Sequence, residues 1–209
     1  MIIDPAQLLI FVPAALLLNL TPGADMLFCL GQGLKSGPKA GLAASIGIAT
    51  GSMIHALLAA FGLAALLAAY PFAFEIIRWA GVGYLVWLAV QALRQPAARL
   101  RPTDCRAGSE LRAWRDAVFV NLLNPKVAIF ILAFVPQFVD PARGSTVLQF
   151  LLFGAILNVG GTIINGLVGA FAGGIGRALA ANDRIARVYR WLSSLLFLGL
   201  AARLAFDRR

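Results

Sequence analysis

The stretch Asn19-Leu-Thr-Pro-Gly-Ala-Asp25 interrupts a long apolar segment, and Asn121-Leu-Leu-Asn-Pro-Lys126 interrupts a second one later in the chain. Proline has no N–H to donate and clashes with the preceding turn, so carbonyl groups near it lose their helical partners. In lipid, such groups must be satisfied by protein or by water in a cavity. Two matching breaks favour a binding site over two harmless kinks, and they predict helices that are broken at Pro22 and Pro125.

The composition around these breaks is that of a membrane protein. Of the 209 residues, 60% are hydrophobic and only 13% are charged, whereas soluble domains contain about 25% charged residues. One small core cannot bury this surplus of apolar residues, and a disordered chain would contain far fewer of them. Two cysteines are too few for a disulfide scaffold. A soluble domain, a disordered chain and a disulfide-rich secreted protein are therefore excluded.

Six windows are long and apolar enough to cross a bilayer, which takes roughly 20 residues. The last window has arginines near its ends, and these side chains can reach the interface. We therefore expect an all-α membrane protein with six transmembrane helices. The windows are Leu8–Leu30, Gly41–Ala69, Ile76–Leu93, Ala117–Val139, Thr146–Ile175 and Tyr189–Phe206.

The net charge of +9 is explained by membrane topology. Most of the 18 basic residues fall in alternate loops, and an excess of lysine and arginine marks cytoplasmic loops. We expect the basic loops inside, next to the headgroups of membrane lipids, and both termini outside. No nucleic-acid partner is needed to explain the charge.

We expect a single transmembrane transporter domain, residues 1–209, built from two inverted repeats. A polar loop, about residues 94–115, separates a first repeat, about residues 5–93, from a second, about residues 116–206. Three spans in each half place the two halves in opposite orientations, as in many secondary transporters. One shift of the chain also aligns Pro22 with Pro125 and Gly51 with Gly154.

Asp25 and Lys126 lie deep within predicted spans, each just after a break. A charge at the membrane centre costs about 2.5–3.5 kcal/mol on insertion scales, so such groups usually pair or line a wet cavity. One hypothesis is that they hold the carboxylate and ammonium groups of a zwitterion. The alternatives are a structural salt bridge between the two helices, and a proton-coupling role for Asp25, because burial favours a protonated carboxyl group.

Further polar residues in the spans extend the candidate site. His55, the single histidine, shares a helix face with Ser45 and Ser52, and it bonds to a neighbouring helix, relays protons or contacts the substrate. A polar stripe in the fifth span must turn away from lipid, toward substrate or toward a closely packed helix. The candidate substrate-binding or coupling residues are Asn19, Thr21, Pro22, Gly23, Asp25, His55, Asn121, Asn124, Pro125, Lys126, and the stripe Asn158, Thr162 and Asn165.

Neither a catalytic centre nor a metal or cofactor site is expected. One histidine without a cysteine or carboxylate cluster does not make a metal site, and the sequence contains no nucleotide-binding or hydrolase motif. We therefore expect a transporter and not an enzyme. The alternative is a membrane protein that handles metal ions or thiol redox equivalents, for which Cys29 and Cys105 would matter.

These motifs resemble the LysE/RhtB family of amino-acid exporters over essentially the whole chain. The two interrupted stretches carry the resemblance, together with Gly41-Leu-Ala-Ala-Ser-Ile-Gly47, Gly51-x-x-x-His55, Gly81-x-x-Tyr84-Leu85, Phe130 and Pro136-Gln-Phe138. The family's first break usually reads Pro-Gly-Pro, whereas this chain has Ala24 in place of the second proline. That change removes one ring and leaves the matching Asp25 in place.

The resemblance implies a six-helix secondary exporter of amino acids or close derivatives in the cytoplasmic (inner) membrane. It implies a small zwitterionic substrate, export driven by antiport with an ion, expected to be the proton, and a homodimer. The sequence does not identify the amino acid. The family's characteristic positions correspond here to Asn19, Pro22, Gly23, Asp25, His55, Asn124, Pro125 and Lys126.

Overall fold

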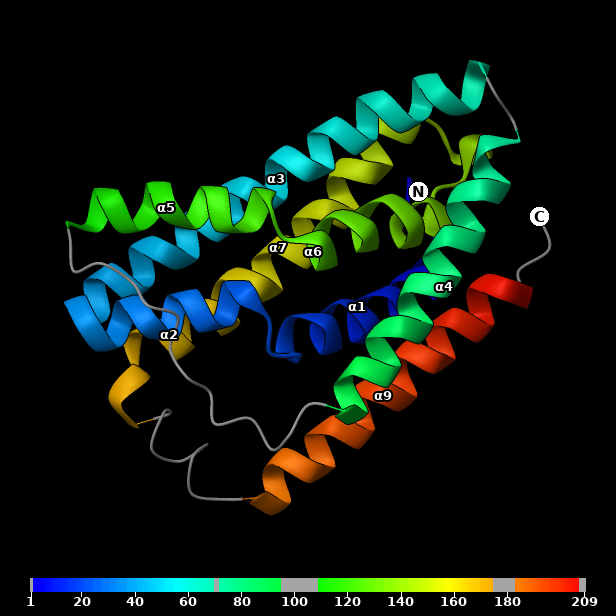
Figure 1. The fold of residues 1–209 in the computed structure, drawn as a ribbon. Helices are drawn as coiled ribbons and strands as arrows, with labels where there is room; N and C mark the ends of the chain where they lie inside the picture. The colour runs from blue at the N-terminus through cyan, green and yellow to red at the C-terminus, as the bar shows by residue number, and fades with distance from the viewer. Residues whose placement is uncertain (1, 70–71, 95–108, 175–182, 207–209) are drawn as a thin grey trace.

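The computed structural model describes residues 2–69, 72–94, 109–174 and 183–206, and every regular element within these ranges is helical (Figure 1). The prediction of an all-α chain is confirmed for this part of the protein. The elements in chain order are α1 (Pro5–Leu20), α2 (Ala24–Ser36), α3 (Pro38–Ala69), α4 (Ala73–Arg94), α5 (Glu110–Leu122), α6 (Pro125–Ile129), η1 (Phe130–Phe134), η2 (Val135–Phe138), η3 (Pro141–Arg143), α7 (Thr146–Ala170) and α9 (Asp183–Phe206).

Within the described ranges, two helices are by themselves long and apolar enough to cross a membrane. They are α3, over Pro38–Gly62, and α7. Two further spans arise if each bent pair counts as one: α1 with α2, bent by 50°, and α5 with the segment Pro125–Phe138, bent by 54°. The breaks predicted at Pro22 and Pro125 are therefore present. The predicted windows at Ile76–Leu93 and Tyr189–Phe206 fall in α4 and α9.

Local sequence explains where these helices begin and end. Asp4 caps α1, because its Oδ1 accepts a hydrogen bond from the Ala6 N–H at 2.9 Å, and Pro5 occupies the first turn, where no N–H is needed. Ser109 caps α5 in the same way through the Arg112 N–H at 3.4 Å. Because of this cap, α5 begins inside the segment 94–115 that was expected to be a loop.

The helix after the second break differs from the single α-helix expected there. Only α6 is α-helical; η1 is π-helical and η2 is a 3-10 helix. Pro136 lies in η2 and has no N–H for the helical ladder. The neighbouring Gln137 side chain donates from Nε2 to the Ala133 carbonyl oxygen at 2.8 Å, which satisfies a backbone group in this irregular stretch. The irregular helix is thus explained by proline and a compensating side chain.

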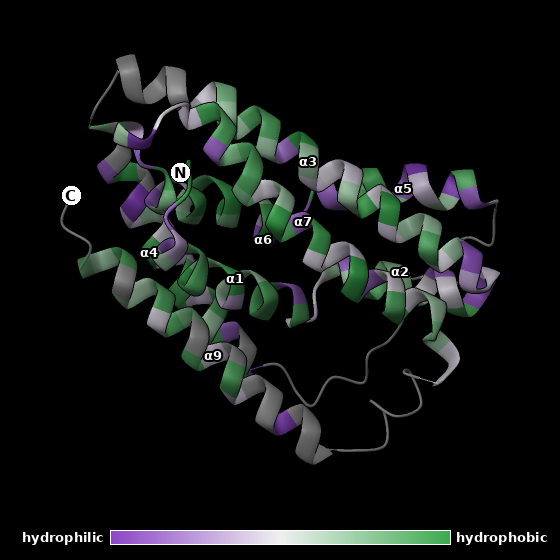
Figure 2. Ribbon diagram, turned by 180° about the vertical axis from the view of Figure 1, so that it is seen from behind, coloured by the Kyte–Doolittle hydropathy of each residue, from purple (hydrophilic) through white to green (hydrophobic). Residues whose placement is uncertain are grey.

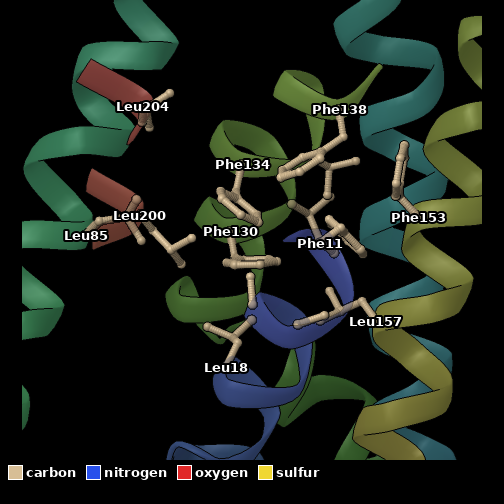
Figure 3. Packing of buried hydrophobic residues seen from close by; sticks show 14 of the residues in the cluster. Phe11, Leu18, Leu85, Phe130, Phe134, Phe138, Phe153, Leu157, Leu200 and Leu204 are labelled. Carbon is tan, nitrogen blue, oxygen red and sulfur yellow. The ribbon is translucent and has the colours of Figure 1, made fainter. Parts of the chain in front are cut away.

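The helices form two sets of close contacts. α3 packs against α2, α5 and α7, and α4 packs against α9. A cluster of phenylalanines fills the side that contains α1 and the segment after the second break (Figure 3). Phe11, Phe134, Phe138 and Phe153 are at most 2% exposed, and their ring centroids lie 4.7–6.1 Å apart in the contacting pairs.

Hydrophobic residues cover most of α1 and α7, whereas hydrophilic residues gather at the far ends of α2 and α5 (Figure 2). Large apolar side chains also face outward, among them Leu58, Phe61 and Leu195, each at least 61% exposed. In a soluble protein such a surface would be exceptional. It is the surface expected of helices that face lipid.

Candidate functional site

The first break is a short extended segment between α1 and α2. α1 ends at Leu20, and the Thr21 hydroxyl folds back to donate to the Leu17 carbonyl oxygen at 2.7 Å. Gly23 precedes α2 with no side-chain cap. A methyl group added at Gly23 would lie 3.6 Å from Lys126 Nζ, so the second broken helix packs directly against this turn. Lys126 therefore lies beside the turn that follows α1.

The second break is capped by Asn124. Its Oδ1 accepts a hydrogen bond from the Lys126 N–H at 3.0 Å, and Pro125 takes the first helical position of α6. This pairing of an asparagine cap with a following proline starts a new helix in a new direction. Lys126 is placed in the first turn after the break, as Asp25 is in α2.

The Asp25 carboxylate binds both asparagines of the second break. Asn121 Nδ2 donates to Oδ2 at 2.9 Å, and Asn124 Nδ2 donates to Oδ1 at 2.9 Å. Asn121 is completely buried and Asn124 is 6% exposed. Each carboxylate oxygen thus takes one amide donor, which offsets part of the desolvation of this charge.

Lys126 makes the reciprocal connection to the first break. Its Nζ donates to the Leu18 carbonyl oxygen at 2.9 Å and to the Thr21 carbonyl oxygen at 2.7 Å. These carbonyl groups lie at the end of α1, where Pro22 cannot supply a helical donor. Among the residues that the structure describes, no ion pair within 4.0 Å joins Lys126 to Asp25. The two charged side chains lie close in the fold, but they do not bind each other. Asp25 binds side chains of the second break, and Lys126 binds carbonyl groups of the first break.

His55 approaches the second break from α3. Its Nε2 lies 3.3 Å from the Asn121 carbonyl oxygen, an atom that only accepts, so this contact requires the tautomer protonated on Nε2. Asn121 therefore connects His55, through its backbone, with Asp25, through its side chain. The hydrogen bond to a neighbouring helix, one of the expected roles of His55, is present.

The polar stripe of α7 connects α7 with α3. Asn158 Nδ2 donates to the Ala49 carbonyl oxygen at 3.0 Å, and the Ser45 hydroxyl donates to the Thr162 carbonyl oxygen at 2.8 Å. Asn19 adds a third contact, from Nδ2 to the Leu157 carbonyl oxygen at 2.9 Å. Some polar groups of this stripe are therefore engaged in hydrogen bonds between packed helices.

A cavity of about 30 Å³ lies between the breaks and the α7 stripe, with room for a few water molecules. Six predicted residues line it, whereas the others, His55 and Lys126 included, lie outside its wall. Ser52 also lines it; it shares a helix face with His55 in the sequence but was left out of the candidate site. The lining residues are Leu18, Asn19, Asp25, Ile48, Ser52, Asn121, Val127, Leu157, Asn158, Gly161, Thr162 and Asn165.

The described part of the chain contains no group of three or more histidine, cysteine, aspartate or glutamate side chains able to hold a metal ion. Cys29 is fully buried in α2, and Cys105 lies outside the described residues. The polar groups of the cavity are amides, hydroxyls and one carboxylate, which suit hydrogen bonding to a small polar solute.

Comparison with known proteins identifies the family of this chain. The model of the family described as "LysE type translocator" matches residues 16–208, which include both breaks and every lining residue of the cavity. The chain belongs to the LysE family. The resemblance to LysE/RhtB exporters is confirmed, and the LysE protein described here is a membrane protein of a transporter family.

Relatives of this LysE protein include proteins named for amino-acid efflux. A homoserine/homoserine lactone efflux protein of Salmonella typhimurium is 36% identical over 66% of each chain. A leucine efflux protein of an Enterobacter species is 31% identical over 93% of each chain. An uncharacterized membrane protein of Vibrio cholerae is 33% identical over 94% of this chain and 95% of its own length. No solved structure matches the chain.

Proposed function

We propose that this LysE protein is a secondary active exporter of amino acids or close derivatives across the cytoplasmic membrane. The observation that carries the proposal is the polar cavity between two broken helices, with the charge of Asp25 in its wall. Transporters commonly place substrate sites at breaks of this kind, where unwound backbone and helix ends face a solute. The relatives named for homoserine and leucine efflux support a small amino-acid substrate.

The proposed architecture has six spans in two inverted three-helix repeats within one domain. Two features support it. Helices in corresponding positions of the two halves pack together, α3 with α7 and α4 with α9. α1 begins and α9 ends at the same end of the molecule, as an even number of spans requires (Figure 1). The homodimer implied by the resemblance stays a prediction.

In the proposed orientation, the basic loops face the cytoplasm and both termini face outward. α2 ends and α5 begins at the end of the molecule opposite the start of α1 (Figure 1). Lys39 belongs to the first turn of α3, directly after α2, and Arg112 belongs to the first turn of α5. This separation of basic residues is consistent with the positive-inside rule. Tags at either terminus are expected to be accessible from outside intact cells.

Transport requires the site to open, because the cavity is far smaller than an amino acid. In the proposed mechanism, the two breaks let one half move against the other, so the site alternates between the two sides. Asp25 or His55 carries the coupling proton. Both are titratable, and Asn121 connects them.

The test is efflux from cells loaded with a panel of amino acids, comparing the wild type with Asp25→Asn at matched expression. We expect selective efflux of one class of amino acid, and its loss in the variant. A well-inserted wild type that exports no amino acid would contradict the proposal. The proton component is tested separately: efflux that does not respond to an imposed pH gradient or to an uncoupler excludes it.

A further inference from the structure

We propose that the cavity recognises the ammonium group of the substrate, and that the substrate needs no carboxylate charge to be recognised. The proposal rests on the exporter function above and specifies its substrate class. Primary amines with an uncharged acyl group, such as amides, esters or lactones of amino acids, would bind as well as the free amino acids.

The charge of the cavity wall is the first argument. Of the described residues that line it, Asp25 alone is charged. Each of its oxygens accepts one amide N–H, so each retains a lone pair for a further donor. A carboxylate in an apolar protein interior attracts a cation and repels an anion far more strongly than it would in water. The wall therefore favours an ammonium group over a carboxylate.

A second acceptor lies beside this carboxylate. Asn121 lines the cavity and is completely buried, and its Oδ1 has no hydrogen-bond partner. The orientation of the amide is fixed, because a carboxylate oxygen can only accept and must therefore face Nδ2. The oxygen packs beside Gly51 of α3. An unpartnered buried acceptor is unfavourable, and a donor that reaches it from the cavity relieves it. An ammonium group has three N–H donors, enough for both Asp25 and Asn121.

The position of Lys126 is the third argument. A zwitterion held between Asp25 and Lys126 would need the Lys126 ammonium group to face the cavity. Instead, Lys126 is absent from the wall, and its Nζ donates to the Leu18 and Thr21 carbonyl oxygens. Lys126 is therefore a positioning residue that holds the end of α1, and the substrate carboxyl group meets only neutral side chains.

The experiment is competition in proteoliposomes that contain the full-length protein and export radiolabelled leucine or homoserine, whichever the protein transports. L-leucinamide and homoserine lactone carry the ammonium group without a carboxylate. N-acetyl-L-leucine and N-acetylhomoserine carry the carboxylate without the ammonium group. We expect the first pair to inhibit about as well as the free amino acids, and the second pair to be weaker by at least roughly tenfold, as for a lost hydrogen bond to a charged group.

Lys126→Met separates a positioning role from contact with the substrate. If Lys126 only holds α1, the variant lowers the maximal rate but leaves the ratio of the two inhibition constants, leucinamide over leucine, unchanged. If Lys126 bound the substrate carboxylate, the variant would weaken leucine and spare leucinamide, and the ratio would fall. Lys39→Met, an exposed lysine in α3, is the matched control. The wild-type competition test needs no variant, so it remains decisive if Lys126→Met does not fold.

The outcomes distinguish this inference from the proposed function. Export that both classes of analogue inhibit equally, or that only the N-acetyl compounds inhibit, overturns the ammonium site and leaves the exporter in place. An altered inhibition ratio in Lys126→Met also overturns it. A wild type that exports no amino acid overturns the exporter, and the ammonium site with it.

Discussion

Asp25 follows the first break and binds the asparagines of the second, whereas Lys126 follows the second break and binds the carbonyl groups of the first. At each break, polar groups are therefore hydrogen-bonded by the charged residue that follows the other break. Movement of one break is expected to disturb the other, because the four hydrogen bonds join them directly.

Replacing Lys126 by methionine should destabilise the folded protein by about 1–3 kcal/mol, because two carbonyl groups at the end of α1 lose a charged donor. Those groups are the carbonyls of Leu18 and Thr21. The measurement is the apparent melting temperature of purified protein in detergent, with Lys39→Met as the control. Equal melting temperatures for the wild type and Lys126→Met would show that the contacts do not stabilise α1.

Replacing Asp25 by asparagine should lower export by at least roughly tenfold, since it removes the acceptor of charge-assisted hydrogen bonds. The amide that replaces the carboxylate has one acceptor oxygen for the two asparagine donors. Initial efflux rates at matched membrane levels measure the effect. Asp116→Asn is the control, because Asp116 pairs with Arg115 at the surface and is remote from the cavity wall. If both variants export normally, Asp25 is not on the transport path.

Replacing Gly51 by alanine should impair both stability and export. The added methyl group would lie 2.8 Å from Asn121 Oδ1, closer than real contacts allow. Overpacking of this kind costs about 1–3 kcal/mol, and it would displace the asparagine that binds Asp25. Gly62→Ala, in the same helix, meets nothing within 4 Å and is the control. Melting temperature and efflux rate are compared for the pair, and the prediction is wrong if Gly51→Ala behaves like Gly62→Ala.

Replacing Phe134 by alanine should cost about 3–5 kcal/mol, the range for large-to-small substitutions of buried phenylalanine. Its ring is fully buried and contacts Phe11, Phe130 and Phe138 (Figure 3). Phe61→Ala removes an exposed ring and is expected to change stability little. Thermal unfolding of both variants in the same detergent provides the measurement. Similar melting temperatures for the two would mean that the cluster relaxes around the lost ring.

Replacing both cysteines by alanine should leave export within about twofold of the wild type, a free-energy change well under 1 kcal/mol. Cys29 is buried in α2 and belongs to no metal-binding group in the described residues. The measurement is efflux from loaded cells by the double variant. Loss of export at normal protein levels would instead favour the alternative of thiol or metal handling.

Part of the candidate site could be predicted because its signals are local. Asn19, Asp25, Asn121 and the α7 stripe are polar residues within apolar stretches, and they do line the cavity. Ser52 also lines the cavity, but its place on the same helix face as His55 does not by itself predict a site residue, because a serine in a membrane helix can bond within its own helix. The π-helical and 3-10 segments after Lys126 also escaped prediction, because an apolar run has no pattern that distinguishes them from an α-helix.

Hydropathy, proline and spacing act locally, so the order of residues alone predicts where the helices lie, where two of them break, and which charges lie beside the breaks. Which groups meet depends on how the helices are oriented in three dimensions. Bends of 50° and 54° set the direction of each helix after its break. These directions bring Asp25 to two amides and Lys126 to two carbonyl groups. Opposite charges in a sequence suggest a pair, but helix orientation places better-aligned hydrogen-bond partners nearer to each of them.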